Sequence, residues 1–250
     1  MHFDLTVIIP TFNEEENIEK MVFAVDSVCR AHNISEEILV VDDSSSDNTI
    51  SIVKRLMDGN PFLHLLIRTQ NPGLSPSIYD GIKEAGSDLV QCLDCDFSHP
   101  PEKIPVFYNL LKNDGYDMVI GSRYIKGGEV INWPLLRRVL SSGAALLSRL
   151  LIPHIKDSGS GFFAINRNIL KATRLSPRGF RMGFEILGKA YWTRVQEIPI
   201  IFKDREFGQS KLKGRIIYDF LIQCGSILHY NFIDRQSNNI IRAWKIFLYR

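Results

Sequence analysis

The sequence predicts an α/β fold with a mostly parallel sheet and helices on both of its faces. Short runs of Val, Ile and Leu alternate with helical segments through the first half of the chain, which is typical of a parallel sheet covered on both sides. Two of these runs end in clusters of acidic residues, where a ligand crevice opens in such sheets. With 250 residues, 45% of them apolar, the chain is long enough for one large domain with its own core.

Five strands and the helices between them are expected in the first half. The first strand is expected over 5–10, and Asn13, with Glu16 at the capping-box position, is expected to begin the following helix. Asp47 is expected to begin the next helix, after a strand over 38–42. The other expected elements of this half are strands over 63–67, 89–94 and 118–121, and helices that follow Gly73 and Pro100.

The second half has weaker periodic signals. The expected elements are helices over 135–151 and 212–230, a glycine-rich turn over 157–162, and a strand over 195–202. Charged or polar residues interrupt both helices, which favours amphipathic helices over membrane spans. We therefore expect one globular domain over 1–214, followed by a helical segment over 215–250 that suits a membrane surface.

The charge of the chain is nearly balanced overall but uneven along its length. A formal net charge of +2 gives no basic field that would attract nucleic acid, so we expect no nucleic-acid partner. The basic residues that gather late in the chain suit a phosphate-bearing or membrane-surface partner; they are Arg137, Arg138, Arg149, Arg205, Lys211, Lys213 and Arg215. Four cysteines without a signal peptide indicate the reducing cytosol. We therefore expect a cytoplasmic protein bound peripherally to the cytosolic face of a membrane.

Two acidic clusters follow predicted strands. Asp94 and Asp96 come at the end of an apolar run, and Asp42 and Asp43 follow another. Mg²⁺ and Mn²⁺ are hard ions that bind carboxylate and phosphate oxygens together. The simplest interpretation is an enzyme that binds a nucleotide-diphosphate compound through a divalent metal ion.

Several segments resemble a known family. The segments over 9–18, 41–44 and 94–96 resemble family 2 glycosyltransferases of the GT-A fold, a Rossmann-like α/β fold. Later segments resemble dolichol-phosphate mannose synthases and related polyprenol-phosphate glycosyltransferases; they lie over 96–101, 121–124, 199–205 and 208–212. Together they cover most of the chain in the family's order, which is far more specific than one D-x-D motif.

The resemblance implies a binding site for a nucleotide-sugar donor. The residues implied to bind the donor are Pro10, Thr11, Asn13, Glu14, Asp42, Asp43 and Asp94. Asp94 and Asp96 would join Mg²⁺ or Mn²⁺ to the diphosphate, with Asp96 counted among the catalytic residues. Ser98 stands where relatives often carry a glutamine that approaches the metal, and it is predicted as a third ligand.

The implied acceptor is a dolichyl or polyprenyl phosphate. Its phosphate is already anionic, so it needs fixed cations more than a general base. The candidates are the catalytic Arg123, Arg137 and Arg205, with Lys211 in substrate binding. The implied reaction transfers mannose from GDP-mannose with inversion of the anomeric centre. Small membrane-anchoring subunits remain open as further partners.

Other interpretations stay open at this stage. The chain could use another sugar nucleotide, such as UDP-glucose, or a sugar hydroxyl acceptor with Glu185 as the base. It could also be an inactive subunit that only binds nucleotide or lipid, although the intact acids and arginines argue against this. We interpret His99 as a loop residue stacked near the site rather than a metal ligand, and Phe162 and Phe163 as core residues.

Overall fold

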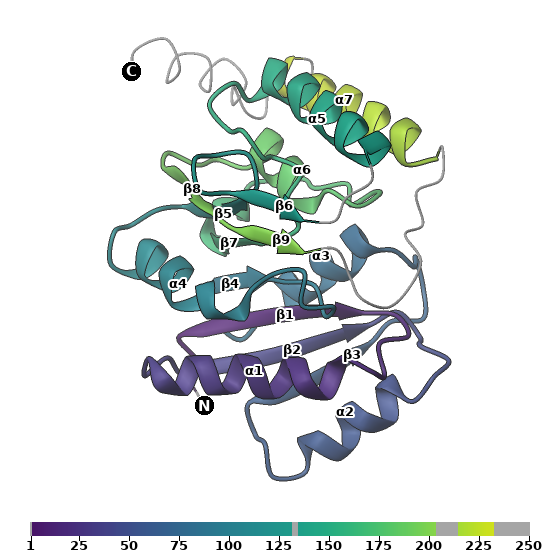
Figure 1. Cartoon of the computed structure of the whole chain (residues 1–250), viewed down its shortest axis with the longest axis vertical. Helices are drawn as coiled ribbons and strands as arrows, with labels where there is room; N and C mark the ends of the chain where they lie inside the picture. The colour runs from purple at the N-terminus through teal and green to yellow at the C-terminus, as the bar shows by residue number, and fades with distance from the viewer. Residues whose placement is uncertain (1, 132–134, 204–214, 233–250) are drawn as a thin grey trace.

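A seven-stranded mixed sheet organises the protein. The computed structural model describes residues 2–131, 135–203 and 215–232. The strand order is β3-β2-β1-β4-β7-β5-β8, and β6 pairs with β9 in a separate parallel ribbon (Figure 1). All neighbours in the large sheet are parallel except β7, which runs antiparallel to β4 and β5. The predicted mostly parallel α/β sheet is therefore confirmed.

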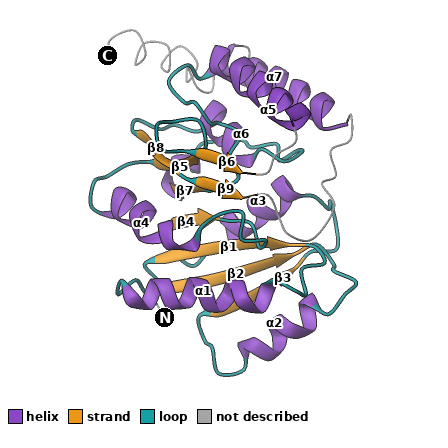
Figure 2. Ribbon diagram, in the orientation of Figure 1, coloured by secondary structure: helices purple, strands orange, loops and turns teal. Residues whose placement is uncertain are grey.

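Strands and helices alternate as expected through the first half (Figure 2). The elements of this half are β1 (Leu5–Thr11), α1 (Ile18–Ala31), β2 (Glu36–Asp42), α2 (Thr49–Met57), β3 (Leu63–Ile67), α3 (Leu74–Glu84), β4 (Leu89–Cys92), η1 (Pro101–Lys103), α4 (Ile104–Lys112) and β5 (Met118–Ser122). Those of the second half are β6 (Glu129–Ile131), α5 (Leu135–Leu151), β7 (Phe163–Asn166), η2 (Arg167–Leu170), α6 (Met182–Lys189), β8 (Val195–Pro199), β9 (Ile201–Lys203) and α7 (Arg215–Phe232).

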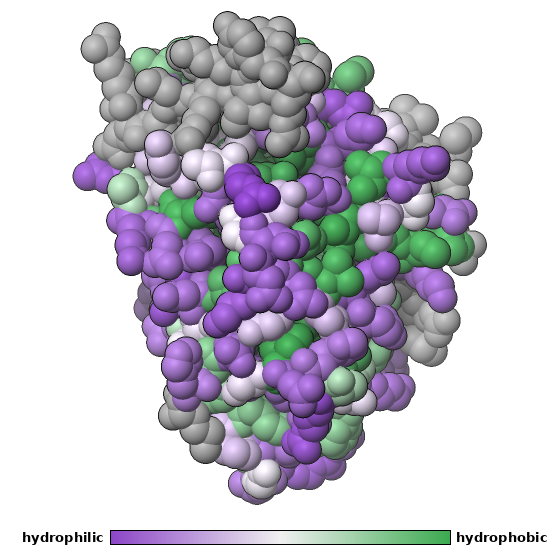
Figure 3. All heavy atoms as spheres, turned by 90° about the vertical axis from the view of Figure 1, so that its left-hand side faces the viewer, coloured by the Kyte–Doolittle hydropathy of each residue, from purple (hydrophilic) through white to green (hydrophobic). Residues whose placement is uncertain are grey.

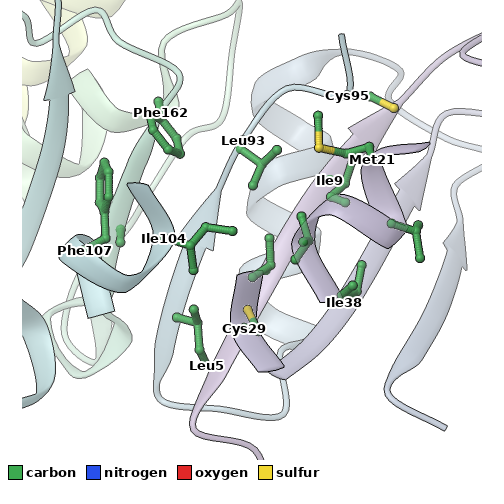
Figure 4. Close-up of a cluster of buried hydrophobic side chains, with 14 of the residues drawn as sticks. Leu5, Ile9, Met21, Cys29, Ile38, Leu93, Cys95, Ile104, Phe107 and Phe162 are labelled. Carbon is green, nitrogen blue, oxygen red and sulfur yellow. The ribbon is translucent and has the colours of Figure 1, made fainter. Parts of the chain in front are cut away.

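The core lies on both faces of the sheet because successive strand side chains point to opposite sides. On one face, Leu5, Val7 and Ile9 of β1 pack with buried residues of α1, α2 and α4 (Figure 4). On the other face, Ile8 packs with buried residues of α3, α6 and α7. Phe162 and Phe163 are fully buried on opposite faces, which confirms that they are core residues.

The structure differs from the expectations at several places. Helix α1 begins at Ile18, and Asn13 does not cap it because its φ of 58° lies in the left-handed region. The strand expected over 195–202 is two strands, since the chain leaves the large sheet at Ile200 and β9 joins β6 instead. Strand β7 was missed altogether: its four residues directly follow the glycine-rich turn and pair with strands distant in sequence.

Helices α5 and α7 lie at the end of the molecule opposite α2 (Figure 1). Both carry exposed large apolar side chains; these are Leu146, Leu147 and Leu150 on α5, and Tyr218, Leu221, Leu228 and Phe232 on α7. The face drawn in Figure 3 has its hydrophobic residues gathered mainly in the upper half. Within the described ranges, no helix combines the length and apolar character needed to cross a membrane.

Candidate active site

Asp42 is a buried residue at the carboxyl end of β2 that accepts several hydrogen bonds. Its carboxylate accepts hydrogen bonds from the Thr11 hydroxyl at 2.7 Å, and from the Ser45 backbone N–H at 2.8 Å and hydroxyl at 2.7 Å. Asp42 is fully buried and Thr11 nearly so. These bonds fix the loop after β2 against the end of β1, the place where a nucleotide was expected.

Two loops meet beside this residue. The Asn13 backbone N–H donates to the Ser45 hydroxyl, and the Asn13 side-chain oxygen accepts from the Ser46 N–H at 2.9 Å. Glu14 donates its N–H to the Thr49 hydroxyl at 2.8 Å. Asn13 therefore joins two loops at the strand ends rather than starting a helix.

Asp43 is engaged by a residue that sequence reasoning missed. The buried Arg68 guanidinium forms an ion pair with Asp43, and donates to Asp80 and Ser77 at 2.9 Å each. The other oxygen of Asp43 accepts the Gly73 N–H at 2.6 Å. Asp43 thus shapes the loop before α3 through charge-assisted bonds. The only signal for Arg68 in the sequence is its position directly after the third strand.

Asp94 and Asp96 lie in the loop after β4, which ends two residues earlier than expected. The Asp94 side chain is 31% exposed. The Asp96 carboxylate accepts the Ser98 N–H at 3.1 Å. Both carboxylates are thus held at the same edge of the sheet as Asp42, because β1, β2 and β4 are parallel.

His99 supports this loop from the core. Its ring is buried, stacked on Phe162 with centroids 5.0 Å apart, and its Nδ1 accepts the Asp94 backbone N–H at 2.9 Å. Burial lowers the pKa of His99, which favours the neutral ring that this acceptor role requires. The structure is consistent with the expected stacking role.

The loop has the donor set that a hard divalent ion prefers. The Ser98 hydroxyl is buried and has no hydrogen-bond partner among the described residues, so a further ligand would satisfy it. Asp94, Asp96 and Ser98 together offer oxygen ligands only, as Mg²⁺ and Mn²⁺ favour. Within the described part of the chain, no group of three or more His, Cys, Asp or Glu side chains forms a metal site. The ion would therefore draw its remaining ligands from a bound diphosphate and water.

Arg123 forms a buried two-pronged pair with Asp157. Its Nε and Nη2 each donate to the Asp157 carboxylate at 2.7 Å, and its backbone N–H donates at 2.9 Å. Only 10% of the Arg123 side chain and 1% of the Asp157 side chain are exposed. The Arg123 guanidinium, which was predicted to bind a phosphate, therefore binds Asp157 of the glycine-rich loop in this structure.

The glycine-rich loop over 157–162 links these groups. A Cβ at Gly161 would lie 3.7 Å from Oδ1 of Asp94 and 3.3 Å from the His99 ring. A Cβ at Gly159 would lie 2.5 Å from Nη1 of Arg181. Glycines at these two positions let the Asp94 carboxylate and a guanidinium lie directly against the loop. Arg181, at the start of α6, is a second cation near the site that sequence reasoning missed.

Glu185 has a structural environment. It is buried, and it accepts hydrogen bonds from the Ser176 backbone N–H, from Lys189 at 3.0 Å and from Gln223 at 3.2 Å. Lys189 also donates to Ser226 of α7 at 2.9 Å. This network joins α6 to α7.

Three predicted acceptor residues cannot be placed. Arg205 and Lys211 lie outside the described residues. Arg137 belongs to α5, but its side chain is not described. Their predicted roles stay predictions.

Comparison with known proteins identifies relatives along most of the chain. Residues 6–174 match the family model described as Glycosyl transferase family 2. A dolichol-phosphate mannosyltransferase of Pyrococcus furiosus is 42% identical over 87% of this chain and 61% of its own length. Proteins of the same name from Mycosarcoma maydis and Saccharomyces cerevisiae are 33% and 30% identical, over 91% and 100% of this chain and 80% and 96% of theirs. The chain thus spans about 61% of the archaeal relative and most of the two fungal ones.

Solved structures share the fold at lower identity. Glucosyl-3-phosphoglycerate synthase from Mycobacterium tuberculosis, in complex with Mn²⁺, UDP and phosphoglyceric acid, has a TM-score of 0.63 and 20% identity over 89% of this chain and 79% of its own. Its complex with Mg²⁺ and UDP gives the same TM-score over 89% of this chain and 80% of its own. This likeness confirms the expected GT-A fold.

Proposed function

The chain belongs to glycosyl transferase family 2 and is a glycosyltransferase, and we propose that it transfers mannose from GDP-mannose to dolichyl or polyprenyl phosphate with inversion. Relatives named dolichol-phosphate mannosyltransferase support mannosyl transfer to dolichyl phosphate. The observation that carries the proposal is the Asp94–Asp96 loop, which places two carboxylates at the carboxyl edge of the sheet, next to the buried Ser98 hydroxyl, which has no partner among the described residues.

The acids would hold the donor through Mg²⁺ or Mn²⁺. When bound, such an ion neutralises the negative charge that builds on the departing nucleoside diphosphate. Asp94 and Asp96 would bind it, with Ser98 as the third protein ligand. Asp42 and the loops joined by Asn13 and Ser45 would fix the nucleoside beside them.

The environment of Glu185 favours a phosphate acceptor over a sugar hydroxyl. A hydroxyl acceptor needs a carboxylate base within reach. Glu185, the base on which that alternative depended, is buried and paired with Lys189. A phosphate monoester carries its own negative charge and needs no such base.

We place the enzyme on the cytosolic face of a membrane, and the exposed apolar residues of α5 and α7 support its contact with a bilayer. An acceptor with a polyprenyl chain lies in a bilayer, so a peripheral enzyme must come to the bilayer surface. Leu146, Leu150 and Leu221 are each more than half exposed and suit burial at the lipid interface. Small membrane-anchoring subunits are further proposed partners of this surface.

A donor and acceptor panel tests the proposal. The purified protein is incubated with Mn²⁺ or Mg²⁺, a short polyprenyl phosphate, and GDP-mannose, UDP-glucose or another sugar nucleotide. We expect a mannosyl lipid from GDP-mannose, and no product after EDTA is added. Preferred use of UDP-glucose, or glycosylation of a sugar hydroxyl with no product from the lipid phosphate, would overturn the proposed reaction.

A further inference from the structure

We propose that Arg181 binds the phosphate of the acceptor, in a seat formed by Gly159 of the glycine-rich loop and Phe220 of α7. This inference deepens the proposed function and rests on it. None of the acceptor residues predicted from the sequence includes Arg181, which lies directly before α6.

The Arg181 guanidinium lies between two surfaces. Its carbon Cζ is 4.6 Å from the centre of the Phe220 ring, a cation–π distance. On the other side, an added Cβ at Gly159 would lie 2.5 Å from Nη1, so only glycine leaves room for this placement. The packing fixes where the guanidinium lies without using its N–H groups.

Those N–H groups have no acceptor in the described structure. Among the described residues, the Arg181 guanidinium makes no hydrogen bond and no ion pair, whereas Arg123 nearby has Asp157. A guanidinium carries five donors in a fork that matches phosphate oxygens. Burial and the positive charge of Arg123 lower the pKa of Arg181, and the nearby charge of Asp157 only partly offsets them. A cation placed this way indicates an anionic ligand.

The position of the glycine-rich loop places that anionic ligand near the acidic residues proposed to bind the nucleotide-sugar donor. Within five residues, Asp157 binds Arg123, Gly159 lies against Arg181, and Gly161 faces the Asp94 carboxylate. An anion on Arg181 is therefore one short loop away from the groups that would hold the donor. The donor diphosphate is already assigned to Asp94 and Asp96, so the anion at Arg181 belongs to the acceptor.

The surroundings of Arg181 favour a lipid phosphate. Arg181 and Phe220 line one pocket together with Phe180, which is 47% exposed, and with the polar Asp219 and Gln223. A ligand with its phosphate on Arg181 can place an apolar chain against Phe180 and Phe220. A free phosphate or a small phosphate ester would gain the contact to Arg181 but none of this apolar surface.

Binding measurements on three variants test the inference. Arg181→Met keeps the apolar packing on Phe220 and removes the hydrogen-bond donors of the guanidinium. Gly159→Ala displaces the guanidinium, which is the mobile end of a side chain. Arg178→Met, at an exposed arginine three residues away, is the matched control. Calorimetry in the presence of GDP and Mn²⁺ measures the Kd of a short-chain isoprenyl phosphate and of glycerol 3-phosphate, and a separate titration measures the Kd of GDP.

We expect the Kd of the isoprenyl phosphate to rise roughly 10- to 100-fold in Arg181→Met and in Gly159→Ala, because each variant loses charge-assisted hydrogen bonds to the phosphate. The GDP Kd should stay within about twofold of the parent, and Arg178→Met should match the parent in both. Because both variants disable one contact, Gly159→Ala should add little in the Arg181→Met background.

Two results separate this inference from the proposed function. If the parent binds isoprenyl phosphate and Arg181→Met binds it equally well, Arg181 is structural and only the inference fails. If glycerol 3-phosphate binding depends on Arg181 but isoprenyl phosphate does not bind, the proposed lipid acceptor is wrong, whereas the phosphate-binding role of Arg181 is supported. If the parent binds neither probe, both fail.

Discussion

The proposed donor side and the proposed acceptor side of the site, called the donor side and the acceptor side below, are built in different ways. On the donor side, Asp42, Asp43, Asp94 and Asp96 lie directly at or after the carboxyl ends of parallel strands. On the acceptor side, Arg123 and Arg181 are positioned by a loop that precedes the antiparallel strand β7. The donor side follows from local strand endings, whereas the acceptor side depends on contacts between distant segments. This difference tells us where single substitutions should change chemistry and where they should change structure.

The largest effect is expected on the donor side. Asp94→Asn and Asp96→Asn should each fold normally and lower kcat by roughly 100- to 1000-fold, about 3–4 kcal/mol at the transition state. Each change removes a metal ligand and leaves the diphosphate charge poorly neutralised. Steady-state turnover measures the loss, with Asp88→Asn as an exposed carboxylate control. Full activity of either variant in the presence of EDTA would refute the metal role.

A large effect on stability is expected on the acceptor side. Asp157→Asn leaves the buried Arg123 guanidinium without its counter-charge, a change that typically costs about 3 kcal/mol or more. Urea unfolding measures the free energy of unfolding. Glu19→Gln breaks the exposed Glu19–Arg55 pair and should cost less than about 1 kcal/mol. Equal stability of the two variants would mean that the Arg123 pair does not hold the acceptor side together.

The same contrast explains what the sequence could predict. The strand endings at Asp42 and Asp94 are local signals, because an apolar run followed by acids reveals both the strand and the edge it points to. Strand β7 has only four residues, and its place between β4 and β5 is decided by pairing with segments far away in sequence. The pattern of the chain therefore indicated the sheet but not its antiparallel member.

Side-chain partners were the least predictable part. Asp43 was predicted to follow a strand and Arg123 to bind phosphate, but their partners Arg68 and Asp157 are 25 and 34 residues away. Arg181 carries no local motif, and its proposed role depends on a glycine 22 residues earlier and a phenylalanine in α7. Ion pairs between distant residues require the fold, which the sequence pattern does not specify.

Membrane binding should depend on the acceptor side alone. Leu146→Asp combined with Leu150→Asp places two charges on side chains of α5 that are 66% and 60% exposed. Because both would have to enter the lipid interface, the affinity for anionic vesicles should fall by about tenfold or more. Vesicle flotation measures binding, which should also weaken as salt rises.

The matched control carries the same charges on the donor side. Phe23→Asp with Val106→Asp changes two exposed apolar residues of α1 and α4 and should leave flotation unchanged. If the α5 variant floats as the parent does, or if both variants lose binding together, the assignment of the membrane surface to α5 is wrong.

The smallest effect concerns the two ends of one strand. Asp42 ends β2 at the site, whereas Glu36 begins the same strand at the opposite edge of the sheet. Burial raises the pKa of Glu36 from 4.5 to about 7, and a hydrogen bond with Asp26 adds to the rise. Between these two pH values the folded protein keeps a proton that the unfolded chain loses. The free energy of unfolding should therefore fall as pH rises from 4.5 to about 7 and stay low above it.

Glu36→Gln removes this titration while keeping a donor for Asp26. Above pH 7 it should be more stable than the parent by about 1–2 kcal/mol, and below pH 4.5 the two should be nearly equal. Urea unfolding across this pH range measures the difference, with the exposed Glu84→Gln as control. GDP affinity should not change, because the amino end of β2 supports the fold and the carboxyl end carries the site. A variant that matches the parent at every pH would show that Glu36 titrates in the folded protein as it does in the unfolded chain, and a changed GDP affinity would show that the two ends of the strand are coupled.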